Sequence, residues 1–243
     1  MTALRAACHV HSDWSYDGAW RLNDLVRAFR RRRYDVVLTA EHDVGFTPDR
    51  WRRYQEACAE ASTDRLLVVP GIEYSDADNC VHLAVWGNLS FFGEGLETKR
   101  VLQCVREHSG VAVLAHPGRR HALERIPPSS FTDLTGIEIW NRKYDGWAPN
   151  AQAMTVAEEQ GLVPFVGHDF HTARQFFPLA MTLKVEGLTV EYVYDALRHR
   201  QCEARAFRLP ATRAAQGSPL VAFRGAERIR PPLARTVRMV MRK

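Results

Sequence analysis

The sequence predicts an α/β fold in which strands and helices alternate and the strands run parallel. Short apolar runs recur along the chain, and most are separated by a segment with apolar residues at helical spacing. Such alternation implies a parallel sheet with right-handed crossovers. About seven strand and helix units are enough to close a barrel, in which the loops after the strand carboxyl ends hold the chemistry.

Length and composition fit one large domain with a tail. The chain has 243 residues, of which 46% are hydrophobic and 25% charged, as is ordinary for a soluble globular protein. We place the domain at residues 1–205 and the tail at 206–243. No stretch approaches the roughly 18 apolar residues of a membrane span, and no signal-peptide pattern is seen. We therefore expect no transmembrane segment and a cytoplasmic location.

Strands are expected wherever a β-branched or apolar run is bounded by turn residues. They are the run that ends at His11 and residues 35–40, 66–73, 81–86, 111–115, 136–141, 162–167 and 181–185. Helices are expected over residues 22–29, 49–61, 97–108, 150–160 and 190–200. Pro48 precedes the second helix and the arginines at 30–33 follow the first, as suits a helix start and a helix end.

Potential metal ligands cluster at the ends of these strands. His9 and His11 are two residues apart, so a strand would place both side chains on one face, and Asp169 and His171 repeat this spacing. Asp17 lies in a Ser/Asp/Gly turn just after the first strand, and His82 lies on the short strand at 81–86. The full set is His9, His11, Asp17, His42, Glu73, His82, His116, Asp169 and His171.

Nine imidazole and carboxylate donors exceed what one ion uses and suit two or three divalent ions. Because the five cysteines form no Cys-x-x-Cys pair, we expect no thiolate site, and the donors fit Zn²⁺, Mn²⁺ or Fe²⁺. Glu73 is the natural bridging ligand, since its two oxygens can each hold an ion. Clustered ions lower the pKa of a shared water to about 7 and hold the oxygens of an in-line displacement. Phosphoester hydrolysis uses both effects.

Five motifs in order resemble the PHP (polymerase and histidinol phosphatase) superfamily of metal-dependent phosphoesterases. They are His9-x-His11-Ser12 with Asp17-Gly18, Glu41-His42-Asp43, Gly71-Ile72-Glu73, Ala115-His116-Pro117 and Asp169-Phe170-His171. The resemblance covers roughly residues 5–200. It implies a distorted (β/α)7 TIM-like barrel of the PHP type that holds up to three metals.

The resemblance also implies how the ligands are shared. His9, His11, Glu73 and Asp169 would hold one metal, Asp17, His42 and His171 a second, and Glu73, His82 and His116 a third. Glu73, Asp17 and His171 are the expected catalytic residues. His82 lies in no tight motif, so His121 is an alternative candidate for the same ligand position.

Two residues depart from the family pattern. Glu41 precedes His42 where the family commonly has Asp, and His168 stands where Ser is frequent. Alternation places His168 on the opposite face from Asp169, so we expect a packed residue or one that supports a ligand.

A phosphate also needs cationic partners. Arg119 and Arg120 follow His116-Pro117-Gly118, and Arg142 and Lys143 follow the strand at 136–141. We expect one or two of these four to bind substrate.

The tail is strongly basic. Residues 205–243 hold ten Lys and Arg against one acid, for +9, so the other 204 residues carry −4 of the total +5. The tail is interrupted by prolines, and Leu233, Val237 and Val240 would line one face of a helix. We favour docking of the tail on the domain, or a tail that is simply solvated. The alternative is that the tail binds an anionic partner, either nucleic acid or a membrane surface. Truncation before Gln216 is expected to spare hydrolysis of a small phosphoester.

The favoured function is hydrolysis of a small phosphorylated substrate, either a phosphomonoester or a short phosphodiester. One alternative is an exonuclease-like enzyme that acts on polynucleotides, and another is a non-catalytic, metal-stabilised PHP module. An amidohydrolase is a further alternative, although no Lys is clearly placed at a strand end for carbamylation. The sequence indicates neither the substrate nor an oligomeric state.

Overall fold

The computed structural model describes the backbone of residues 1–240 and the side chains of residues 1–230. The strands are β1 (Thr2–Val10), β2 (Val36–Thr39), β3 (Glu41–His42), β4 (Leu67–Val69), β5 (Gly71–Ser75), β6 (His82–Trp86), β7 (Val111–Leu114), β8 (Gly136–Asn141), β9 (Val163–Gly167), β10 (Leu179–Val185), β11 (Cys202–Ala206) and β12 (Leu209–Pro210). The α-helices are α1 (Leu22–Arg31), α2 (Pro48–Ala61), α3 (Thr98–Glu107), α4 (Ala122–Arg125), α5 (Ala151–Glu159), α6 (Val190–Arg198), α7 (Ala211–Ala214) and α8 (Gly217–Val240).

The strands lie in two six-stranded sheets, not in one continuous sheet. Their orders are β12-β11-β10-β1-β2-β4 and β3-β5-β6-β7-β8-β9. The predicted strand at 66–73 passes from the first sheet into the second, as β4 with β5, and the predicted strand at 35–40 is β2, which the chain follows directly with β3 of the second sheet. Pro70 separates β4 from β5, because proline has no N–H to donate to a ladder.

The sheets are also mixed, so the expectation of an all-parallel sheet is wrong. β6 pairs antiparallel with both β5 and β7, and β10 pairs antiparallel with β1 and β11. The loop at residues 76–81 explains why β6 is antiparallel to β5, since it is short and a parallel crossover needs a dozen or more residues. β11 and β12 were not predicted, and β11 runs across the proposed domain boundary at 205.

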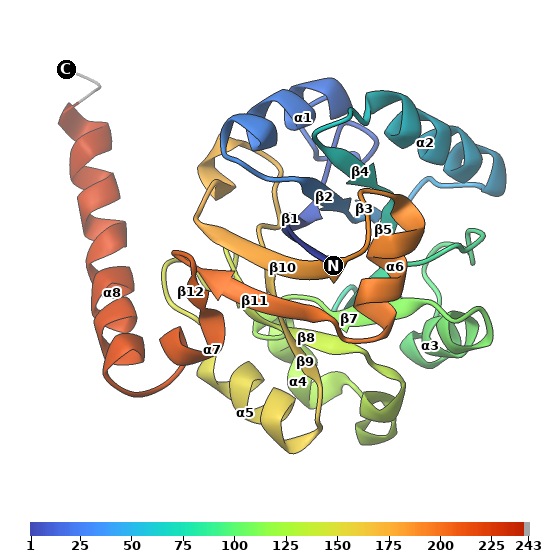
Figure 1. Cartoon of the computed structure of the whole chain (residues 1–243). Helices are drawn as coiled ribbons and strands as arrows, with labels where there is room; N and C mark the ends of the chain where they lie inside the picture. The colour runs from blue at the N-terminus through green and yellow to red at the C-terminus, as the bar shows by residue number, and fades with distance from the viewer. Residues whose placement is uncertain (241–243) are drawn as a thin grey trace.

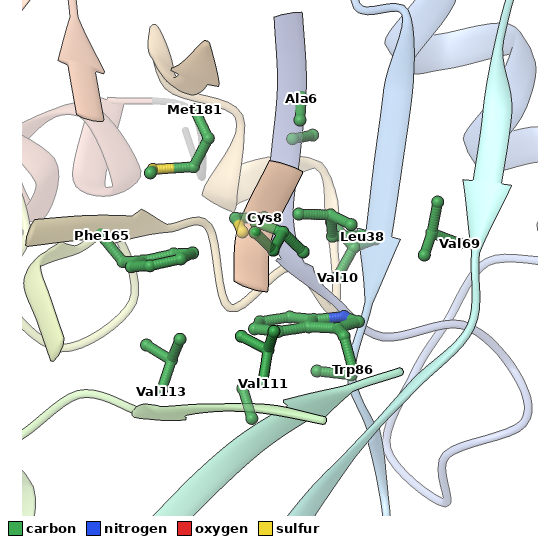
Figure 2. Packing of buried hydrophobic residues seen from close by; sticks show 14 of the residues in the cluster. Ala6, Cys8, Val10, Leu38, Val69, Trp86, Val111, Val113, Phe165 and Met181 are labelled. Atoms are coloured by element: carbon green, nitrogen blue, oxygen red, sulfur yellow. The ribbon is translucent and has the colours of Figure 1, made fainter. Parts of the chain in front are cut away.

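One core joins the two sheets, and helices surround the strands (Figure 1). Trp86 of the second sheet lies fully buried with its ring stacked on Phe165, at a centroid separation of 6.4 Å. Figure 2 shows these rings beside Cys8 and Leu38 of the first sheet. Inward side chains from both sheets therefore fill one interior.

Hydrogen bonds join the carboxyl end of β1 to the segment that follows β9. His168 N–H donates to the Cys8 carbonyl at 2.9 Å, and Phe170 N–H donates to the His9 carbonyl at 3.1 Å. The first and last clusters of candidate ligands are thereby held together, although about 160 residues separate them in the chain.

The tail forms one helix where the sequence predicted a chain broken by proline. α8 spans Gly217–Val240 and continues through Pro231 and Pro232. Pro219 lies in its first turn, where a missing N–H loses no bond. The side chains of Leu233, Val237 and Val240 lie outside the described residues, so the predicted apolar stripe is not tested. Within the described part of the chain, no helix is long and apolar enough to cross a membrane.

Candidate metal centre

The candidate ligands meet at one end of the strands. His9 lies in β1 and His11 directly follows it, His42 ends β3, Glu73 lies in β5, and His116, Asp169 and His171 follow β7 and β9. His82 begins β6, and because β6 runs antiparallel its first residue lies at the same end as Ser75 of β5. All of these residues are buried, whereas Asp17, in the loop after β1, is not.

Three of these residues have a left-handed backbone. φ is +58° at His9, +28° at His116 and +46° at Asp169. Such values are uncommon for residues with a side chain and concentrate at functional sites. At His9 the register between β1 and β2 shifts in a bulge. The rings of His9 and His11 lie 5.1 Å apart, so the pair converges through this bulge and not through simple alternation.

Three overlapping triads have ligand atoms within 4.8 Å of one another, the spacing that one ion could span. They are His9, Glu73 and His116; His9, His11 and Asp169; and His11, His42 and His171. Because the triads overlap, the donors are arranged as a site for more than one metal.

Several of these donors lack a hydrogen-bond partner although they are buried. They are His9 Nε2, His11 Nε2, His42 Nε2, His116 Nδ1 and Asp169 Oδ2. Unpaired buried polar atoms are rare, and a bound ion is one explanation for them. Burial, with neighbouring His42 and His171, holds the pKa of His11 well below its usual value, so its ring stays neutral as a metal ligand must. The residues present therefore fit a metal cluster.

Glu73 lies between the groups of imidazoles. Its Oε1 is 2.7 Å from His116 Nε2 and 3.4 Å from His9 Nε2, whereas its Oε2 is 3.0 Å from His42 Nδ1 and 3.6 Å from His11 Nε2. Burial alone would raise the pKa of this carboxyl, but the surrounding imidazoles outweigh burial and hold the pKa well below its usual range. The two oxygens face two different groups of donors, as a bridging carboxylate requires.

Asp17 closes the outer side of the cluster. Its carboxylate lies 3.0 Å from His171 Nε2 and 3.3 Å from His42 Nε2. Burial raises its pKa, yet the close imidazoles of His171 and His42 outweigh this and leave the pKa below its usual value. The structure thus brings Asp17, His42 and His171 together, the grouping that the resemblance implies.

The grouping expected around His82 differs from the one observed. His82 is buried and its Nδ1–H donates to Glu73 Oε1 at 2.8 Å, but it belongs to none of the triads among the described residues. His9 takes its place beside Glu73 and His116. The rival His121 is 78% exposed and faces Glu124, so it lies away from the cluster.

Glu138, which sequence reasoning missed, orients two of the donors. Its Oε1 accepts from His9 Nδ1–H at 2.8 Å, and its Oε2 accepts from the His116 backbone N–H at 2.7 Å. This leaves His9 Nε2 facing the cluster. A Cβ on Gly167 would lie 2.0 Å from Glu138 Oε1, so only glycine fits there. The available signal was an acid inside the apolar strand at 136–141, since acids are almost never buried unless paired.

Glu41 holds the loop that carries Asp17. It accepts from Ser12 N–H at 2.9 Å and from the hydroxyls of Ser12, Ser15 and Tyr54. Ser15 Oγ in turn lies 3.2 Å from His11 Nδ1, which directs His11 Nε2 toward the cluster. The Glu that departs from the family pattern thus supports the ligands without lying among them.

His168 lies on the far side of the strand from the cluster, as predicted from alternation. It is buried, packs against Phe29, and its Nε2 lies 3.1 Å from the Phe177 carbonyl oxygen.

Beside the cluster lies a cavity of about 270 Å³. Of the four candidate cations, Lys143 and Arg119 line it. Lys143 Nζ lies 3.2 Å from Asp169 Oδ1, and Arg119 donates to His82 Nε2 at 3.0 Å. Arg120 and Arg142 are not among the lining residues: Arg120 donates to the Asn79 carbonyl, and Arg142 packs over the ring of Phe177 at 5.1 Å. Tyr16, stacked on His42, and Tyr144, beside His116, also line the cavity, as do acids that include Asp43 and Glu94.

Comparison with solved structures identifies the fold. A two-domain protein from Bacteroides vulgatus that contains a predicted PHP-like metal-dependent phosphoesterase matches with a TM-score of 0.63 at 18% identity, over 84% of this chain and 65% of that one. The fold is similar to that of PHP-like phosphoesterases. PsfC from Pseudomonas syringae matches with a TM-score of 0.62 at 15% identity, over 94% of this chain and 98% of PsfC.

An amidohydrolase from Chromobacterium violaceum, with bound sulfate and no metal, matches with a TM-score of 0.51 at 15% identity, over 69% of this chain and 88% of that one. No protein-family model and no curated protein sequence matches this chain. The likeness of fold and the buried histidine clusters agree with the resemblance to PHP proteins seen in the motifs.

Proposed function

We propose that this chain is a metal-dependent phosphoesterase that hydrolyses a small phosphomonoester or short phosphodiester. The observation that carries the proposal is the position of Glu73 between two groups of imidazoles, beside a cavity lined by Lys143 and Arg119. Two or three divalent ions, when bound, would lower the pKa of water and stabilise charge on the phosphoryl oxygens. Lys143 and Arg119 would hold the phosphoryl group, and Glu138 and Glu41 would keep the ligands oriented.

We also interpret the two sheets as the distorted (β/α)7 barrel of PHP proteins. β2 with β3 and β4 with β5 connect the sheets on one side, and the bonds from the segment after β9 to β1 connect them on the other. Inward side chains fill this ring, as they do in a barrel core.

The first test is metal content. After mild purification, elemental analysis should find about two to three equivalents of transition metal per chain, because the donors exceed what one ion can use. The variant His11→Ala should lose metal, since His11 belongs to two triads. The matched variant His121→Ala, at an exposed site, should keep it. One equivalent or less in the wild-type chain would contradict the cluster.

The second test concerns phosphate binding and uses two adjacent arginines. Arg119→Ala should raise KM for a small phosphoester about 10- to 100-fold, since a hydrogen bond to a charged group contributes about 1.5–3 kcal/mol. Arg120→Ala should leave KM unchanged because Arg120 does not border the cavity. Metal content should stay the same in both variants. Equal kinetics in the two would remove Arg119 from the substrate site.

The alternatives make different predictions. An exonuclease-like enzyme would bind polynucleotide through the basic tail with an affinity that falls steeply with salt. An amidohydrolase would turn over amides and not phosphoesters, and a non-catalytic module would do neither. Lys143 and Arg119 favour a phosphoester, because an anionic substrate would meet both cations in the cavity, where the bound ions would offset the acids that also line it.

A further inference from the structure

The loop at residues 142–148, between β8 and α5, brings two side chains to the cavity. Lys143 reaches Asp169 and lies 3.3 Å from His171 Nε2. Tyr144 lies 4.7 Å from the ring of His116, and its hydroxyl accepts from Arg119 Nε at 3.1 Å. The conformation of this loop therefore decides where Lys143 and Tyr144 lie relative to the metal ligands.

The start of the loop is held from within the domain. The side-chain oxygen of Asn141 accepts from the backbone N–H groups of Lys143 at 3.0 Å and Tyr144 at 3.2 Å. Asn141 Nδ2 donates to Glu138 Oε2 at 2.7 Å, which ties the loop to the carboxylate that orients His9.

The end of the loop is held by the tail. Glu227 of α8 accepts from the Trp147 backbone N–H at 2.8 Å. Gly146 has a φ of +71°, and a Cβ there would lie 2.5 Å from Glu227 Oε2, so the carboxylate touches the loop backbone. Arg230 donates to Glu227 from the next turn of the helix and holds the carboxylate in place.

An aromatic contact lies beside this carboxylate. Phe223, one turn before Glu227, packs edge-on against Trp140 at 5.1 Å, and Trp140 Nε1–H donates to the Gly146 carbonyl at 3.2 Å. The other side of α8 is open, with Val221 71% and Ile229 57% exposed. α8 lies on the outside of the molecule (Figure 1), so its contact with the body runs largely through this loop and its neighbours.

We propose that Glu227 is a positioning residue that clamps the loop at 142–148, so that Lys143 and Tyr144 face the bound substrate. The inference rests on the proposed phosphoesterase function and makes the tail part of the active site's support. It replaces the expectation that truncation before Gln216 spares small-substrate hydrolysis. Truncation is expected instead to weaken substrate binding, because the Trp147 N–H loses its acceptor and the loop gains freedom.

Kinetics of matched variants in the full-length, metal-loaded chain test the clamp. Glu227→Ala should raise KM for a small phosphomonoester about three- to tenfold, with kcat and metal content little changed. Glu227→Gln retains an acceptor for Trp147 N–H and should recover most of the loss. Arg228→Ala, at an exposed neighbour on the same helix, should behave as wild type. A loss that Gln does not recover, or an equal loss in the Arg228 variant, would overturn the proposal.

A double-mutant cycle shows whether Glu227 acts through Lys143. Adding Glu227→Ala to Lys143→Ala should raise KM little further, whereas adding it to an Arg228→Ala background should have its full effect. Additive effects of Glu227→Ala and Lys143→Ala would overturn the proposed route.

Amide hydrogen exchange separates failure of this inference from failure of the proposed function. In Glu227→Ala, exchange at residues 143–147 should become faster while β8 and β9 keep their protection. Unchanged exchange would overturn the clamp even if the enzyme is active. Absence of phosphoester turnover by the wild-type chain would instead contradict the function, and faster loop exchange would still support the clamp.

Discussion

Replacing Glu73 with Gln should remove metal and phosphoesterase activity together. The substitution keeps the shape of the side chain but deletes the negative charge shared by the imidazoles of His116 and His42 and by the ions they would bind. Breaking a buried charge pair costs about 3–5 kcal/mol, which corresponds to a metal affinity lower by about two to four orders of magnitude. Elemental analysis and kcat on the same preparation measure both effects.

Glu94→Gln is the matched control for this experiment. Glu94 also borders the cavity, but it is exposed and belongs to no triad in the described part of the chain, so this variant should retain its metal. A Glu73→Gln protein with full metal content and full activity would show that Glu73 does not bridge ions.

Replacing Glu138 with Gln should have the next largest effect, although Glu138 is not expected to contact a metal. Without the carboxylate, the His9 Nδ1–H loses its charged acceptor and the ring is no longer held with Nε2 toward the cluster. Loss of such a supporting partner typically lowers metal affinity or activity about 10- to 100-fold. Competition with a chelator of known affinity would measure the change, with phosphoester turnover as a second readout.

Glu203→Gln provides the comparison for Glu138, because Glu203 is an exposed acid on β11, away from the cluster. Its metal affinity should equal that of wild type. If Glu138→Gln also binds metal as wild type does, then packing alone orients His9 and the carboxylate has another role.

The placement of the candidate donor residues at strand ends was predictable from sequence. A run of β-branched residues predicts a buried strand. A histidine or acid directly after such a run must lie at the carboxyl end of that strand. His42 at the end of β3 and His116 after β7 follow this rule, and so does Asp169 after β9. The likeness to PHP-like structures agrees with the family that these motifs indicated.

Side-chain direction was not predictable where the backbone leaves regular geometry. Simple alternation predicted that His9 and His11 share a face, but a bulge and a left-handed residue at His9 bring the rings together. Arg119 and Arg120 are adjacent in sequence, yet only Arg119 lines the cavity. The backbone is left-handed at Arg120, with a φ of +46°, and neighbours along the chain do not reveal such a value.

Contacts between distant segments were decided by the tertiary structure alone. Glu138 meets His9 across 129 residues of sequence, and Glu227 meets Trp147 across 80. A side chain's role in such a pair depends on how the strands and the tail helix pack, and no local pattern carries that information. The sequence by itself therefore determined which residues can hold metal and at which end of the strands they gather, because both follow from local periodicity. Only the folded chain decided which carboxylates orient those ligands and which loop the tail supports, because those contacts exist only once the sheets and α8 have packed.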